Sequence, residues 1–148
     1  MKISTKGRYG LRALIDLSIY GKTGAPVLLS DIAKRQGISE KYLEQIANRL
    51  HKAGLVKTVR GRKGGYLLDK SESEIMLSKI IETLEGPICV VDCVVKPDLC
   101  RRSSLCSARD IWSALSDKIA ETLSQYTLAD LVNMQNEKTN AEAPMYYI

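Results

Sequence analysis

The chain lacks most of the motifs on which catalytic and membrane-spanning proteins depend. Its 148 residues contain one histidine, His51, which excludes His-rich metal sites and makes any serine–histidine or cysteine–histidine catalysis depend on that side chain. Neither a phosphate-binding loop nor a dinucleotide-binding fingerprint is present. No run of 18 apolar residues exists, and the basic N-terminal segment lacks the long apolar centre of a secretory signal. We therefore expect a cytoplasmic protein that is not an enzyme and has no membrane partner.

Charge is distributed unevenly along the chain. Residues 1–70 contain 15 lysines and arginines against 5 acidic residues, a net charge of +10, whereas residues 71–148 have a net charge of −5. Because cationic side chains that neutralise phosphates release bound counterions, a basic segment favours nucleic acid as its partner. An uneven charge distribution can also arise by chance. The hypothesis of a nucleic-acid partner therefore depends on the secondary structure that the sequence predicts.

Helix signals in the first half predict a helix-turn-helix. After an expected helix over 2–20, Ser30 is the expected N-cap of a helix over 31–36, and Ser39 that of a helix over 40–53. The turn between the two short helices is Gly37-Ile38-Ser39. Two short helices joined by a glycine-containing turn of this length are typical of the helix-turn-helix motif.

The second of these helices has an apolar face and a polar face. Leu43, Ile46 and Leu50 recur at spacings of three and four residues and are expected to be buried. Polar side chains on the rest of the surface can read base edges or meet phosphates, although an ordinary solvated face would have a similar composition. The members that we expect to contact DNA are Lys41, Glu44, Gln45 and Arg49.

A basic hairpin follows directly. The β-prone segments 55–59 and 66–68 flank a glycine-rich tip that contains Arg60, Arg62 and Lys63. Three cations on such a tip suit contact with a phosphate backbone or a minor groove. A helix-turn-helix followed by a basic hairpin is a winged helix, so the predicted fold class is mainly α with a small β-hairpin wing.

The second half predicts further helices and an interface. A helical pattern over 77–84 ends at Gly86-Pro87, and a longer helix later has one apolar stripe. We expect this stripe to form the interface of a homodimer, with packing inside the chain as the alternative. Its members are Trp112, Leu115, Ile119 and Leu123. The expected divisions are a winged helix-turn-helix domain (1–86), a cysteine-rich loop (87–107), a dimerisation helix with a short last helix (108–134) and a C-terminal tail (135–148). Residues 135–143 of this tail are polar and are expected to be flexible.

All cysteines of the chain lie in one short segment: Cys89, Cys93, Cys100 and Cys106. Structural zinc sites usually have two closely spaced cysteine pairs, and only the first gap here fits that spacing. Iron–sulfur clusters are also held by thiolates, and a loop can wrap them with less regular gaps. The spacing therefore favours an iron–sulfur cluster over zinc, with a thiol–disulfide switch or no metal as the remaining readings.

Several motifs together resemble one known family. They are the opening segment 1–10 (Met-Lys-Ile-Ser-Thr-Lys-Gly-Arg-Tyr-Gly), the segment 38–45 (Ile-Ser-Glu-Lys-Tyr-Leu-Glu-Gln), Gly64-Gly65-Tyr66 and Leu84-Glu85-Gly86. These motifs resemble the bacterial winged-helix transcription regulators that include IscR, NsrR and CymR, and the likeness covers nearly the whole chain. It implies a homodimer that binds a double-stranded DNA operator, with DNA binding tuned by a cluster in each subunit. It also implies control of iron–sulfur cluster biogenesis genes.

The resemblance also implies a ligand set. Cys93, Cys100 and Cys106 match the three ligating cysteines of the cluster-binding members, in which 2Fe-2S is expected more than 4Fe-4S. Some members use a histidine at the position of Arg109, and arginine cannot ligate because it stays protonated. Cys89 is the nearest substitute for the fourth ligand. The alternatives are Asp92 and Asp98.

The resemblance further implies individual DNA contacts. Ser39, Tyr42 and Gln45 match recognition positions, and Arg60 matches an arginine of the wing. Glu44 matches a glutamate that helps these regulators choose between operators, because a carboxylate can accept from a cytosine amino group and repels phosphate.

Two alternative functions stay open within the same family. Thiolate-held iron and exposed thiols both react with nitric oxide and oxidants, so the signal could be one of these instead of cluster supply. The ending Met145-Tyr146-Tyr147-Ile148 resembles that of the cysteine-metabolism repressors of the family. The resemblance therefore implies cysteine synthase as a second possible partner, bound through Ile148.

Overall fold

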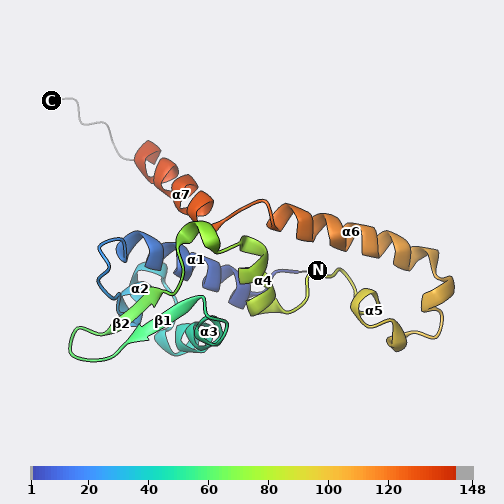
Figure 1. The fold of residues 1–148 in the computed structure, drawn as a ribbon, viewed down its shortest axis with the longest axis horizontal. Helices are drawn as coiled ribbons and strands as arrows, with labels where there is room; N and C mark the ends of the chain where they lie inside the picture. Colours follow the sequence, from blue (N-terminus) through green and yellow to red (C-terminus); the bar gives the residue numbers. More distant parts are fainter. Residues whose placement is uncertain (1, 143–148) are drawn as a thin grey trace.

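The computed structural model describes residues 2–142. An N-terminal body contains most of the helices and the sheet, and α6 with the segment before it forms an arm that projects from this body (Figure 1). The elements in chain order are α1 (Thr5–Tyr20), α2 (Leu29–Gln36), α3 (Glu40–Lys52), β1 (Val56–Val59), β2 (Gly65–Leu68), η1 (Glu72–Glu74), α4 (Leu77–Glu85), α5 (Asp92–Val95), η2 (Pro97–Leu99), η3 (Ser103–Leu105), α6 (Ser107–Leu123) and α7 (Leu128–Glu142). Within the described residues, no helix combines the length and the apolar character needed to cross a membrane.

The helix-turn-helix forms where the sequence predicts it. α2 ends at Gly37, whose φ of 64° is the left-handed conformation that glycine adopts without strain. The Ser39 hydroxyl then accepts from the Tyr42 N–H at 3.2 Å and caps α3. The predicted cap at Ser30 is wrong, because α2 begins two residues earlier than predicted, at Leu29, and Leu28 is its N-cap. The backbone of Val27 pairs with Tyr66 of the wing, and this bridge fixes the extended chain just before the helix.

The wing is an antiparallel pair in which Val56 faces Leu68 and Val59 faces Gly65. Gly65 is required where the wing meets the chain before α2. A Cβ atom at this position would lie 2.5 Å from the carbonyl oxygen of Val27. This close approach holds the wing against the helix-turn-helix, so both elements keep a fixed relative position.

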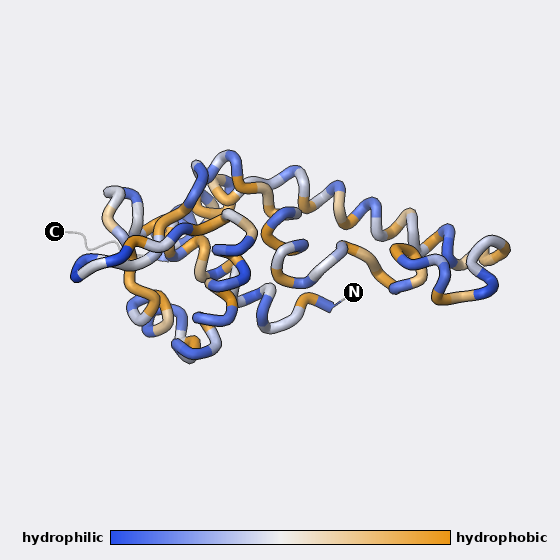
Figure 2. The backbone as a smooth tube through the Cα atoms, turned by 60° about the horizontal axis from the view of Figure 1, so that its bottom comes forward, coloured by the Kyte–Doolittle hydropathy of each residue, from blue (hydrophilic) through white to orange (hydrophobic). Residues whose placement is uncertain are grey.

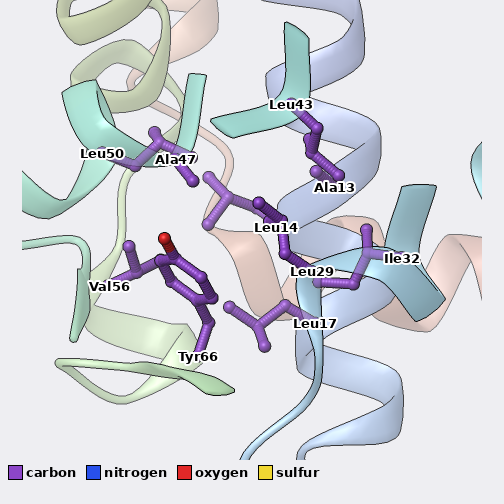
Figure 3. A pocket seen from close by; sticks show the side chains of 10 residues that line it. All are labelled: Ala13, Leu14, Leu17, Leu29, Ile32, Leu43, Ala47, Leu50, Val56 and Tyr66. Atoms are coloured by element: carbon purple, nitrogen blue, oxygen red, sulfur yellow. The ribbon is translucent and has the colours of Figure 1, made fainter. Parts of the chain in front are cut away.

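The core lies between α1, the helix-turn-helix, the wing and α4. Figure 3 shows apolar side chains of α1, α2, α3 and the two strands converging on a small gap among them. Leu14, Leu43 and Ile46 are each about 1% exposed, and Leu84 is fully buried. The predicted apolar stripe of α3 is therefore confirmed, and the gap is part of the core packing.

α7 corrects the prediction of a flexible polar tail. The structure continues this helix to Glu142, so the interpretation of residues 135–142 as a flexible tail is wrong. These residues are polar because most of them are exposed, and a polar helix without an apolar face has no periodic signal. Leu128 and Val132 lie in the same core as α1, so α7 packs on the N-terminal body. Residues 145–148, with Ile148, lie outside the described residues, and the four expected divisions of the chain stay predictions.

The first turn of α1 is held by the last residue of α4. Oε1 of Glu85 accepts hydrogen bonds from the Ser4 N–H at 3.1 Å, the Ser4 hydroxyl at 2.6 Å and the Gly7 N–H at 2.9 Å. Gly7 allows this approach, since a Cβ atom there would collide with the same carboxylate oxygen. A carboxylate at a helix N-terminus is also favoured by the helix dipole.

Replacing Glu85 tests this contact. Glu85→Ala removes the acceptor of three hydrogen bonds, and we expect it to lower the free energy of unfolding by about 2 kcal/mol in urea denaturation. Glu82→Ala is the matched control, because Glu82 lies on the same helix with an exposed side chain. Equal stability of the two variants would contradict the assigned role of Glu85.

Candidate DNA interface and cysteine segment

The polar face of α3 is open to a partner. Ser39, Lys41, Glu44, Gln45 and Arg49 are all exposed. These side chains include donors, acceptors and cations, which is what base reading and phosphate contact need. His51 also lies exposed on α3.

Tyr42 is the member of the predicted set that is half-buried. Its ring meets the ring of Tyr9 edge-on, with 6.2 Å between centroids. Tyr42 therefore couples the start of α3 to α1 while its remaining surface stays accessible. The predicted DNA contacts of α3 stay predictions, since their geometry shows accessibility only.

The wing brings further cations to the same part of the body. Arg60, Arg62 and Lys63 are exposed at its tip. Arg62 and Lys63 line a cleft between the wing and α2 together with Tyr20 and Arg35. Arg35 was missed by the sequence analysis, because its position depends on a partner 19 residues away that no local pattern reveals.

That partner is Asp16, a buried carboxylate of α1 that holds the end of α2. Nη2 of Arg35 lies 2.6 Å from Oδ1 of Asp16, and the Gln36 side-chain amide donates to Oδ2 at 2.8 Å. Hydrogen bonding to Asp16 raises the pKa of Arg35 above its ordinary value. The Arg35 guanidinium also lies 3.8 Å from the centre of the Tyr20 ring. Arg12 completes the contact by donating to the Gln36 carbonyl at 2.7 Å.

These bonds decide where α3 lies. α2 is followed by a two-residue connection to the α3 cap, so a fixed α2 leaves α3 little freedom. A buried charge without its partners costs several kcal/mol, and Asp16 is only 2% exposed. The cluster of Asp16, Arg12, Arg35 and Gln36 therefore helps to fix the position of α3 through its short connection to α2.

The cysteine segment contains short helical turns between Pro87 and α6. The sequence pattern predicts a loop here, whereas the structure places α5, η2 and η3 within the segment. Each of these turns has only three or four residues, which is too short for hydrophobic periodicity to show. Figure 1 places α5 beside α6 at the far part of the arm.

The four cysteines are not gathered into one site. Cys89, Cys93 and Cys106 are half-buried, Cys100 is exposed, and all four are free thiols. Among residues 2–142, no group of three or more histidine, cysteine or acidic side chains is arranged to hold a metal ion. The donor types fit a thiolate-bound cluster, because four thiols lie on one segment with two carboxylates between them. Binding would therefore require the segment to close.

The possible fourth ligands have different surroundings. Cys89 and Asp92 line one cavity with Glu85 and Lys2, next to the N-terminal end of α1. Asp98 is exposed on η2. Arg109 is half-buried and donates through Nε to the Cys93 carbonyl at 2.9 Å, so it contacts the segment as a hydrogen-bond donor.

The predicted interface stripe lies on α6. Trp112 and Leu115 are 40% and 44% exposed, and Ile119 and Leu123 are half-buried. Ile111 adds a further exposed apolar side chain at 65%. Figure 2 shows apolar residues recurring along the arm, away from the body. This surface suits a partner helix, and its role as a dimer interface stays a prediction.

Comparison with known proteins adds independent information. Residues 3–134 match the Rrf2 family, which is described as an iron-dependent transcriptional regulator. Over 136 residues the chain is 42% identical to the HTH-type transcriptional regulator IscR of Serratia proteamaculans (strain 568), a match that covers 92% of this chain and 82% of the relative. The corresponding regulator of Yersinia pestis is 41% identical with the same coverage.

Solved structures agree with the fold. CymR, described as the global cysteine regulator of B. subtilis, superposes with a TM-score of 0.74 at 39% identity, covering 90% of this chain and 98% of CymR. T. potens IscR gives a TM-score of 0.71 at 39% identity, covering 99% of this chain and 97% of that protein.

These findings confirm three expectations from the sequence. The fold is a winged helix, the resemblance to this family holds, and the relatives are transcriptional regulators instead of enzymes. The chain is accordingly a DNA-binding transcription regulator. Because the family match spans residues 3–134, the protein belongs to the Rrf2 family of iron-dependent transcriptional regulators.

Proposed function

We propose that this regulator senses iron–sulfur cluster status through residues 89–106 and controls genes for cluster biogenesis. The observation that carries the proposal is the position of four free thiols on one segment whose first cysteine, Cys89, follows Glu85 by four residues. Glu85 holds the first turn of α1 and lines one cavity with Cys89. A change in this segment therefore has a short physical route to the DNA-binding body. The similarity to proteins named IscR supports the same reading.

Cys93, Cys100 and Cys106 would hold the cluster, with Cys89, Asp92 or Asp98 as the fourth ligand. A bound cluster would supply iron–thiolate bonds that respond to iron supply and to oxidants. Of the two common forms, we propose 2Fe-2S before 4Fe-4S. Zinc is the alternative metal. If the thiols bind zinc, the proposed contacts with DNA stay the same.

On DNA, α3 would lie in the major groove and the wing along the adjacent backbone. Exposed donors and acceptors on α3 would read base edges, while Arg60, Arg62 and Lys63 would meet phosphates. Glu44 would favour operators that offer a cytosine amino group and disfavour close phosphates. Regulation of this kind takes place where the chromosome is, so a cytoplasmic location is part of the proposal.

The regulator would act as a homodimer through α6. Its stripe leaves Trp112 and Leu115 40% and 44% exposed on the projecting arm. An isologous contact would place the same stripe on both subunits and bring two reading helices to a two-fold operator.

Exposure of Cys100 favours a second candidate signal. An accessible thiol is a target for nitric oxide or oxidants, so the protein would then act as a nitric oxide or redox-sensing repressor. The similarity to CymR supports a cysteine-metabolism repressor as a further alternative. Its cysteine synthase partner depends on Ile148, which lies outside the described residues, and no comparison supports that partner.

The wing tests the DNA interface. Lys63→Ala removes one expected phosphate contact, so DNA affinity should fall and the slope of log affinity against log salt should decrease by about one. Arg60→Ala should also weaken binding. Lys79→Ala, an exposed lysine on α4, should bind as the wild type does in fluorescence anisotropy titrations over a range of salt concentrations. Unchanged affinity and slope in both wing variants would exclude the wing from the interface.

Cys93→Ala tests the sensor. Removing one of the three expected ligands should lower iron content sharply and make operator affinity equal to that of iron-free wild type. The expected difference between loaded and iron-free wild type is about 1–3 kcal/mol, the usual size of coupling between two sites. Ser104→Ala, exposed in the same segment, is the control. If Cys93→Ala keeps the affinity of loaded wild type at every operator tested without oxygen, cluster sensing is wrong.

A further inference from the structure

Two side chains of α6 hold the first part of the cysteine segment. Nε of Arg109 donates to the Cys93 carbonyl at 2.9 Å, and Nη2 of Arg109 donates to the Val94 carbonyl at 3.4 Å. The Ser116 hydroxyl accepts from the Val90 N–H at 3.0 Å. Arg109 and Ser116 are seven residues apart, so they lie two turns apart on nearly the same face of α6. Both ends of residues 90–94 are thereby tied to one helix.

The contacts that Arg109 and Ser116 make with residues 90–94 are partly shielded from water, so water competes less for these hydrogen bonds. Ser116 is only 3% exposed, and its hydroxyl also donates to the Trp112 carbonyl at 2.7 Å. Arg109 is half-buried. Hydrogen bonds from a charged donor are stronger than neutral ones, and the planar guanidinium can reach two adjacent carbonyl oxygens.

The later part of the segment has a different set of contacts. In the described structure, the hydrogen bonds of residues 97–106 join neighbouring backbone groups, such as Cys100 N–H to the Pro97 carbonyl at 3.2 Å. Cys106 accepts from the Arg109 N–H as part of the first turn of α6. Cys100 is the exposed thiol of the four, whereas Cys93 is half-buried against α6.

We propose that Arg109 and Ser116 are positioning residues that hold Cys93 fixed on α6, so that Cys100 closes onto a thiol already in place. Ordering a segment costs conformational entropy, and a ligand that is ordered in advance lowers the cost of assembling a site. The role in cluster binding rests on the proposed function. The ordering of Cys93 rests on the contacts of α6 alone.

Amide hydrogen exchange of the reduced, metal-free protein tests the ordering directly. The Val94 and Lys96 amides are hydrogen-bonded to the carbonyls of Val91 and Asp92, so their exchange reports whether α5 stays formed. Arg109→Ala removes both hydrogen bonds from the guanidinium and should accelerate exchange over residues 93–96 by about tenfold or more, since one hydrogen bond to a charged group already has an effect of about this size. Arg109→Lys should have an intermediate effect, because the compact lysine ammonium lacks the planar fork with which the guanidinium reaches both carbonyl oxygens. Ser116→Ala should accelerate exchange at Val90.

Matched controls remove the same atoms elsewhere. Arg101→Ala deletes an exposed arginine of the same segment, and Ser113→Ala deletes a hydroxyl of the same helix. Both should leave exchange over residues 90–96 unchanged. Protection of the α1 and α4 amides shows that each variant keeps its fold. Exchange in Arg109→Ala equal to that in Arg101→Ala would overturn the proposal.

A measurement of iron release distinguishes failure of this inference from failure of the proposed function. Wild type and variants are loaded with iron and sulfide, and the transfer of iron to a chelator is followed by absorbance. Arg109→Ala should release iron about tenfold faster than Arg101→Ala although every thiol is retained. Equal release rates would overturn the part of the proposal that concerns the cluster. If wild type takes up no iron, the proposed function fails, while the exchange experiment still decides whether Arg109 orders Cys93.

Discussion

The Glu85 carboxylate accepts three hydrogen bonds from Ser4 and Gly7 at the start of α1, and the cysteine segment begins just beyond it. α1 in turn supplies part of the surface on which α3 packs, through the edge-on contact of Tyr9 with Tyr42. The end of α4 therefore lies between the thiols and the helix that we propose reads DNA. Because a carboxylate at this point is both a helix cap and a neighbour of Cys89, movement of the segment would act on α1 first.

A second polar contact fixes the position of the helix-turn-helix on α1. Asp16 is buried and is satisfied by Arg35 and Gln36 at the end of α2, so α1 and α2 keep one relative position. The wing is held to the same unit by the bridge between Val27 and Tyr66. These contacts hold α3 and the wing in fixed positions relative to α1 and α2. In the proposed homodimer, a second subunit would pack on α6 and bring a second copy of α3.

Elements of the fold could be predicted where caps, turns or apolar spacing mark them in the sequence. For the candidate site, the sequence predicts which residue types are present and does not predict how they are arranged. The Ser39 cap, the Gly37 turn and the stripe of Leu43, Ile46 and Leu50 follow from spacing, and the structure confirms them. The Asp16–Arg35 pair joins residues 19 positions apart and has no sequence pattern. The length of α7 was missed because an exposed polar helix resembles a polar tail in composition. The thiols were found by counting, but their separation and the contacts of Arg109 depend on how α6 packs against the segment.

We propose that the thiols hold an iron–sulfur cluster that changes DNA binding. Iron, sulfide and zinc are measured in protein purified without oxygen, together with its absorption spectrum. We expect about two iron and two sulfide per chain, or about four of each if the cluster is 4Fe-4S. Zinc, or no metal even after reconstitution with iron and sulfide, would contradict it. The segment would then be a zinc site or a thiol switch on the same winged-helix body.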